Sequence, residues 1–186
     1  FVPTDTTSPP AMTSFILDGG AEQTGTQATV SAEGAHQVSF RSTDQAGNQE
    51  NWQGPVTFRI DTRAPVVTAT LSPDLPPTGW YTGPVTVTLT ASDPDGVGSS
   101  GLASVSYRIS NTLGPGSWVT VPAGSQLVID ADDIHTLYYR ATDTAGNVTA
   151  PARAQTIKID RQAPSVSSWQ FNGTPGNEGW YVTGGM

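Results

Sequence analysis

Apolar residues alternate with hydroxyl-bearing residues over short stretches of the chain. The clearest stretch is Val85–Thr90, in which Val, Val and Leu are separated by threonines. A period of two is typical of a β-strand that buries one face. The same signal, bounded by Gly, Pro, Asn or Asp, predicts about seven short strands in the middle of the chain. They are Val66–Leu71, Val85–Thr90, Val105–Ile109, Trp118–Val121, Gln126–Ile129, Thr136–Ala141 and Gln155–Ile159.

Helical signals are nearly missing. The one helical candidate, Asp130–Ile134, is too short to be more than a turn. About seven strands in roughly 100 residues are the content of an immunoglobulin-like Greek-key β-sandwich. The sequence therefore predicts an all-β fold.

The chain repeats itself at a spacing of about 100 residues. RSTDQAGN at Arg41–Asn48 returns as RATDTAGN at Arg140–Asn147, an offset of 99 (140 − 41 = 99). The same offset relates His36 to His135, and the Gly-Trp-Tyr of residues 79–81 returns at 179–181. Such a period is the size of one sandwich domain.

The repeat divides the chain into tandem sandwich modules, one complete and two partial. We expect residues 1–64 to be the C-terminal part of an immunoglobulin-like module, 65–163 a complete module and 164–186 the start of the next. Between the first two modules, Ile60–Pro65 is short and contains proline, which fixes φ and restricts the preceding residue. The sequence therefore predicts a semi-rigid link.

Charge and composition exclude several classes of function. The net charge is −8, and the eight basic residues are scattered, so the basic surface that nucleic acid requires is missing. No apolar run reaches the roughly 20 residues of a membrane-spanning helix. Cysteine is absent and lysine occurs once, while Gly and Pro are abundant. This composition favours a bacterial protein that is extracellular or located at the cell surface.

Several motifs together resemble a known group of domains. In order they are GWY, SVSYRIS, HTLYYRATDTAGN and IKIDRQAP, all within residues 65–164. This order resembles the bacterial immunoglobulin-like repeat domains of large secreted and cell-surface proteins. The resemblance implies a sandwich fold and a scaffolding, stalk or adhesive role with no chemistry of its own.

The repeated TDxAGN element has the residues of a tight turn. Asp44 and Asp143 are suited to accept backbone N–H bonds, and the glycines that follow can adopt positive φ. Asn48 and Asn147 tolerate the left-handed region. We interpret the element as turn chemistry.

Calcium binding is the alternative for the same residues. Asp143 could join Asp93 and Asp95 of the SDPDGVGSSG loop as oxygen ligands. The loop lacks the twelve-residue calcium pattern with its terminal Glu, so the sequence favours a solvated turn. It predicts no metal site beyond these weak calcium candidates and no other cofactor.

Catalytic motifs are also missing, and we expect no enzymatic activity. There is no GxSxG nucleophile turn, no HxH and no HExxH. The acidic pair Asp132–Asp133 falls in a predicted surface turn without a matching second acid. His36 and His135 are interpreted as structural residues at the starts of strands.

The five tryptophans leave two interpretations open. Trp80 and Trp180 share a repeat position, which predicts packing at a module end. If the chain binds sugars, Trp52, Trp118 or Trp169 should instead form an exposed flat row.

Two functions compete at this stage. The first is a structural or adhesive extracellular repeat that forms a semi-rigid stalk, fibre or surface layer. The alternative is an ancillary carbohydrate-binding or spacer module of a secreted hydrolase. The expected partners are neighbouring modules or identical subunits, joined by strand addition at an incomplete sheet edge, and a polysaccharide.

Overall fold

The computed structural model describes residues 2–94, 96, 98–168 and 173–183, with only the backbone for 181–183. Every described strand pair is antiparallel, and the described helical structure is one 3₁₀ turn, Asn177–Gly179. The all-β prediction is confirmed. No helix within the described ranges is long and apolar enough to cross a membrane.

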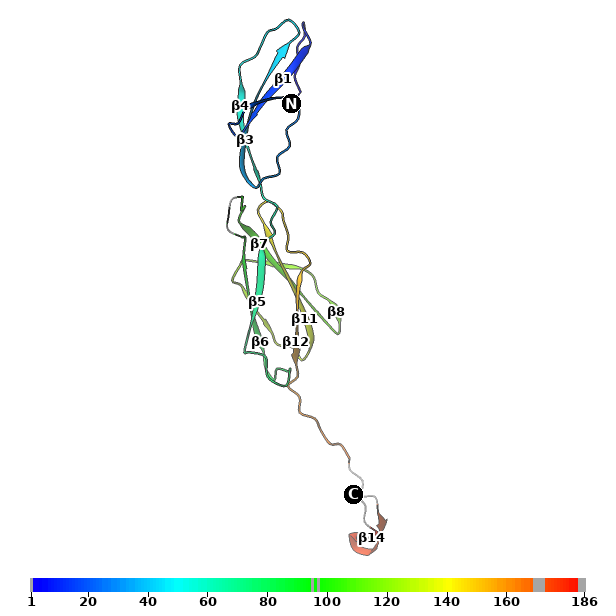
Figure 1. Ribbon diagram of the computed structural model, residues 1–186. Helices are drawn as coiled ribbons and strands as arrows, with labels where there is room; N and C mark the ends of the chain where they lie inside the picture. Colours follow the sequence, from blue (N-terminus) through cyan, green and yellow to red (C-terminus); the bar gives the residue numbers. More distant parts are fainter. Residues whose placement is uncertain (1, 95, 97, 169–172, 184–186) are drawn as a thin grey trace.

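The strands within residues 2–61 form one four-stranded sheet, at the blue end of the ribbon in Figure 1. Its strand order is β2-β1-β3-β4. The strands are β1 (Pro10–Leu17), β2 (Glu22–Thr24), β3 (Gly34–Asp44) and β4 (Gln53–Ile60). Phe15, in the middle of β1, is 4% exposed. All the described strands of this part belong to this single sheet.

The central part of the chain is a two-sheet sandwich. The smaller sheet has the order β10-β6-β5, and the larger has the order β12-β11-β7-β8, with β9 also paired to β7. The strands are β5 (Val66–Ser72), β6 (Val85–Ser92), β7 (Leu102–Asn111), β8 (Gly114–Pro115), β9 (Val119–Val121), β10 (Gln126–Ile129), β11 (Asp133–Asp143) and β12 (Arg153–Ile159). Each of the seven expected strands is present, and the short β8 is additional.

The alternation of residues along the strands produces the core between these sheets. Val85, Val87 and Leu89 of β6 are fully buried, whereas the threonines between them are less buried. Leu137 of β11 and Ile157 of β12 belong to the same buried cluster. Burial of each such side chain stabilises the fold by roughly 1.5–3 kcal/mol.

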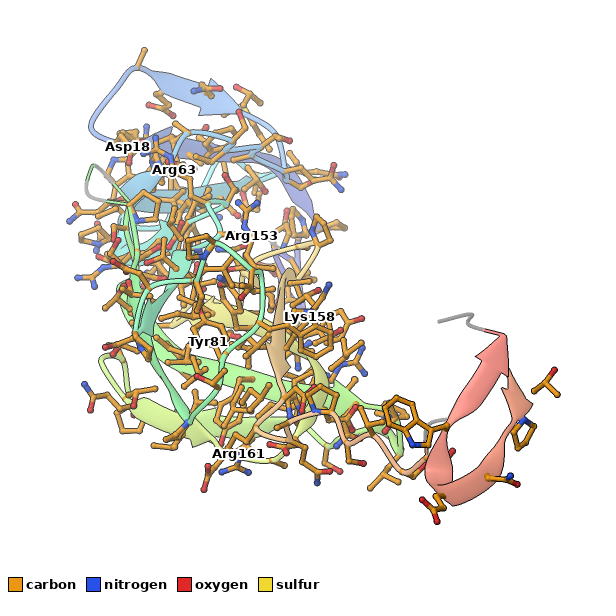
Figure 2. All side chains as sticks on the ribbon, turned by 90° about the horizontal axis from the view of Figure 1, so that it is seen from below. Asp18, Arg63, Tyr81, Arg153, Lys158 and Arg161 are labelled. Carbon is orange, nitrogen blue, oxygen red and sulfur yellow. The ribbon has the colours of Figure 1, made fainter. Side chains whose placement is uncertain are left out.

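The repeated Gly-Trp-Tyr places its tyrosine in the core. Tyr81 is 1% exposed and lies inside the sandwich in Figure 2. The backbone N–H of Tyr81 donates to the backbone oxygen of Lys158 at 2.8 Å. The backbone oxygen of Tyr81 accepts from the backbone N–H of Asp160 at 3.0 Å. Trp80 stays 37% exposed, with its ring 5.5 Å from Lys158 Nζ. Through the backbone hydrogen bonds of Tyr81, the Gly-Trp-Tyr motif therefore holds the chain against the end of β12.

The chain beyond β12 leaves the sandwich. Arg161 lies at the edge of the sandwich (Figure 2), where its Nε donates to Asp132 Oδ1 at 2.7 Å. Residues 160–168 have no regular structure, and the next described strands are β13 (Thr174–Pro175) and β14 (Tyr181–Thr183), which pair as a hairpin. Trp180 in this hairpin is 75% exposed, so the expectation that it packs at a module end is wrong for the described structure. Its packing would need a strand equivalent to β12, and β13 is the only described partner of β14.

Candidate functional site

The TDxAGN turn at the end of β11 is built around a buried carboxylate. Asp143 is 2% exposed, and its Oδ1 accepts the backbone N–H groups of Gly146 at 2.7 Å and Asn147 at 2.8 Å. Its Oδ2 accepts a bond from Asn147 Nδ2 at 2.8 Å. Gly146 has φ +100°, which an L side chain rarely adopts. The turn roles predicted for the aspartate and the glycine are confirmed.

The same turn recurs at the end of β3. Asp44 Oδ1 accepts the backbone N–H of Asn48 at 2.7 Å, and Asp44 Oδ2 accepts Asn48 Nδ2 at 2.8 Å. These bonds from Asn48 lower the pKa of Asp44. Neither Asn48 nor Asn147 has a positive φ, so the tolerance of asparagine for the left-handed region is not used in these turns. Each asparagine holds the turn through its side-chain amide instead.

The loop after β6 contributes a second buried carboxylate. Asp93 is 9% exposed, and its Oδ2 accepts bonds from Ser99 Oγ and from the backbone N–H of Gly101, both at 2.8 Å. Its Oδ1 is buried and has no hydrogen-bond partner in the described structure. A buried oxygen without a partner costs about 1–3 kcal/mol unless a water or an ion satisfies it.

The segment after β4 brings a third carboxylate to this place. Asp61 Oδ2 accepts the backbone N–H of Ser100 at 2.8 Å, and Asp61 Oδ1 accepts that of Arg63 at 3.0 Å. The hydrogen bond to the Ser100 side chain, followed by that to the Arg63 backbone, lowers the pKa of Asp61. Asp61 is therefore ionised at neutral pH.

Together, Asp61, Asp93 and Asp143 form a three-aspartate cluster. Each offers one carboxylate oxygen, and the three oxygens lie within 4.8 Å of one another. The cluster includes two of the weak calcium candidates from the sequence, whereas the third, Asp95, lies outside the described residues. Sequence reasoning missed Asp61 because it stands 32 residues from Asp93 (93 − 61 = 32), in a segment interpreted as a joint. A surface groove beside the cluster is lined by Asp61, Ser99, Ser100 and Thr144, among others.

No described Lys, Arg or His forms an ion pair with the three-aspartate cluster. The nearby Arg63 instead pairs with Glu33, its Nε lying 2.7 Å from Glu33 Oε2. At 4 Å, two like charges repel by about 1 kcal/mol in bulk water and about 4 kcal/mol at the effective dielectric near a protein surface. A cation bound among the three oxygens would relieve this repulsion.

The tryptophans proposed for sugar binding are covered by arginines. The Arg41 guanidinium lies 4.3 Å from the ring centroid of Trp52, and Arg140 lies 4.2 Å from that of Trp118. Each such contact is worth about 0.5–1 kcal/mol at an exposed site. Trp52 and Trp118 therefore do not form an open row, and Trp169 lies outside the described residues.

The histidines and the acidic pair have structural partners. His36 Nε2 and His135 Nε2 lie 2.8 Å and 2.9 Å from the backbone oxygens of Ala32 and Ala131. Both rings are buried near the starts of their strands, as expected. Asp133 accepts a bond from Thr112 Oγ1 at 2.7 Å. His36, His135 and Asp133 thus each have a structural partner within the fold.

The chain is similar in sequence to a chitinase. The chain is 32% identical to chitinase A1 of Niallia circulans over an aligned stretch of 160 residues, and the alignment covers 80% of this chain and 22% of the chitinase. The chain thus spans about a fifth of the length of that relative. A solved structure of fibronectin(III)-like modules of CbhA from Clostridium thermocellum aligns with a TM-score of 0.46 and 16% identity, over 90% of this chain and 88% of that one. No protein-family model matches the chain.

Proposed function

We propose that the chain is a non-catalytic accessory segment of a secreted glycan-degrading hydrolase, in which it acts as a spacer. The observation that carries this proposal is the 32% identity to a chitinase over 160 residues. This similarity favours the ancillary-module alternative over the surface stalk, fibre or adhesive role. It also supports an extracellular location, which the lysine-poor composition, rich in Gly and Pro, independently favours.

The contacts at the joint between the first sheet and the sandwich support a spacer. Thr62 Oγ1 donates to Glu33 Oε1 at 2.6 Å, and Arg63 pairs with the same carboxylate. Gly98 lies so close to the end of the first sheet that an added Cβ would be 2.8 Å from the backbone nitrogen of Gly34. A linker held by contacts on both sides does not behave as a flexible coil.

The linker is also fixed to the sandwich core. The backbone oxygen of Pro65 accepts a bond from Thr149 Oγ1 at 2.8 Å, and both residues are buried. Asn147 Nδ2 donates to the backbone oxygen of Asp61 at 3.0 Å. These bonds connect both ends of the segment 61–65 to the β11–β12 turn.

The spacer role is better supported than sugar binding. Arginines cover one face of Trp52 and of Trp118, which leaves these rings poorly suited to stack on a polysaccharide. Polysaccharide binding and strand addition between copies stay predictions. So do the immunoglobulin-like repeat assignment and the module boundaries at residues 64 and 163.

The proposal is tested in the parent protein by deleting residues 1–186. We expect a hydrolase domain in the flanking sequence, a several-fold loss of activity on insoluble chitin and an unchanged kcat/KM on soluble chito-oligosaccharides. A flexible Gly/Ser linker of equal residue number, as a control, should not restore the activity on the solid. A parent without a hydrolase domain, an equal loss on both substrates, or full activity on the solid would each overturn the proposal.

A further inference from the structure

We propose that the three-aspartate cluster is a calcium site that joins the first sheet to the sandwich. The ligands would be one carboxylate oxygen from each of Asp61, Asp93 and Asp143. This inference goes beyond the spacer role, because it gives the joint a dependence on a metal ion. It does not depend on the identity of the parent enzyme.

The first support is Asp93 Oδ1, a buried oxygen without a described hydrogen-bond partner, which a solvated turn does not explain. Asp93 uses Oδ2 for Ser99 and Gly101, while its buried Oδ1 has no described hydrogen-bond partner. The residue is 91% buried, so solvent reaches this side chain poorly. Oδ1 is thus a buried acceptor that a bound ion or an ordered water would satisfy.

The second support is the spacing of the oxygens. Ca²⁺ takes 6–8 oxygen ligands at 2.3–2.6 Å, so two oxygens on opposite sides of the ion are about 4.6–5.2 Å apart. Three oxygens within 4.8 Å of one another can share such a shell with little movement. The groove lined by Asp61, Ser99, Ser100 and Thr144 gives water access to the cluster from the Asp61 side. Mg²⁺ demands a tighter octahedron at 2.0–2.1 Å and fits three carboxylates on separate segments less well.

The third support is the charge of the site. The cluster holds three carboxylates with no ion-pair partner among the described residues. The nearby Arg63 forms its ion pair with Glu33, and its charge makes only the smallest contribution to the lowered pKa of Asp61. Hard oxygen ligands of this kind suit calcium rather than zinc or copper, which favour nitrogen and sulfur. A bound calcium would remove most of the repulsion among the three groups.

The three ligands come from two parts of the chain, the linker and the sandwich. Asp61 follows β4, whereas Asp93 and Asp143 belong to the sandwich. An ion bound by all three would hold the linker against the sandwich, in addition to the bond between Asn147 and the Asp61 oxygen. Calcium should therefore stiffen the joint.

The second TDxAGN turn provides a matched control. Asp44 and Asn48 make the same two contacts as Asp143 and Asn147. Asp44 does not belong to any described group of three metal-ligating side chains. A substitution there disturbs the turn without touching the cluster.

The test is calorimetric titration of the metal-stripped chain with calcium chloride at 0.15 M salt. We expect one site with a dissociation constant of about 10⁻⁵–10⁻³ M. We also expect a Tm that rises with calcium concentration and much less with magnesium. Asp93→Asn should weaken binding at least tenfold, while Asp44→Asn should leave it unchanged.

If Asp93→Asn fails to fold, Asp61→Asn provides the same test. Asp61 lies on the linker outside the sandwich core, so its substitution should leave the sandwich folded. It should also weaken calcium binding at least tenfold, with a retained β-sheet circular dichroism spectrum. The proposal is overturned if 10 mM calcium produces neither heat nor a Tm shift. It is equally overturned if Asp61→Asn keeps full affinity, or if Asp44→Asn loses as much affinity as the cluster variants.

Discussion

Asn147 donates a hydrogen bond from its side-chain amide to the backbone oxygen of Asp61 at 3.0 Å, across 86 residues of sequence. The same nitrogen also donates to Asp143 Oδ2 at 2.8 Å. One side chain thus closes the turn after β11 and fixes the linker after β4. The repeated TDxAGN motif therefore also helps to hold the joint between the first sheet and the sandwich, a role that the repeat alone does not reveal.

Asn147→Ala should loosen the joint. It removes the bond to a carboxylate, worth about 1.5–3 kcal/mol, and the bond to the linker, worth about 0.5–1.5 kcal/mol. Trypsin should then cut after Arg63 several-fold faster than in the unsubstituted chain. Asn48→Ala is the control, since it opens the equivalent turn far from the linker. Equal cleavage after Arg63 in both variants would show that the Asn147 bond does not hold the joint.

Leu137→Ala should strongly destabilise the sandwich. Leu137 is fully buried between the two sheets, and removing such a side chain leaves a cavity that costs about 2–5 kcal/mol. Val128→Ala in the same sandwich, at a position 63% exposed, should cost less than about 1 kcal/mol. Urea unfolding measures both costs. Similar losses for the two variants would contradict the assignment of the core.

The first sheet should depend on pH through His36 and Asp18. The hydrogen bond from His36 Nδ1 to Asp18 Oδ2, at 2.8 Å, raises the pKa of His36 above its ordinary 6.5 and lowers that of Asp18 below its ordinary 3.8. The contribution of His36 is complete below pH 6.5 and is lost as the pH rises through its raised pKa. That of Asp18 is present above pH 3.8 and is lost as the pH falls through its lowered pKa.

Asp18→Asn measures this contribution. The Tm difference between the unsubstituted chain and the variant should be larger at pH 5.5 than at pH 8.5. In NMR titrations, the pKa of the His36 imidazole should fall when Asp18 is replaced. A Tm difference that is constant with pH, together with an unmoved His36 titration, would rule out the ion pair.

The sandwich strands could be predicted from sequence because their core depends on local alternation. Val85, Val87 and Leu89 point to one side of β6 for a reason that is visible in the order of residues alone. Pattern is not sufficient everywhere. Residues 27–30 occupy the repeat position of β10, residues 126–129, yet they form no strand. β10 forms by pairing with β6, and the described residues 2–61 contain no equivalent of β6.

The candidate site was only partly accessible to sequence analysis. Asp93 and Asp143 could be found because both stand in loops rich in turn residues. Asp61 could not, since its approach to them depends on how the linker passes the end of the sandwich. The repeat did contain one signal that Asp61 has a recurring place in the module, because Ile60-Asp61 returns as Ile159-Asp160. The bond from Arg63 N–H to Asp61 Oδ1 recurs as that from Gln162 N–H to Asp160 Oδ1.

A stiff joint between the first sheet and the sandwich is the central claim, and a distance distribution tests it most directly. The chain has no cysteine, so Thr57→Cys on β4 and Val128→Cys on β10 place one spin label on each side of the joint. Both positions are exposed. In buffer with calcium chloride, we predict that double electron–electron resonance gives a single narrow distance distribution. A broad distribution, as for two bodies on a flexible linker, would contradict the claim.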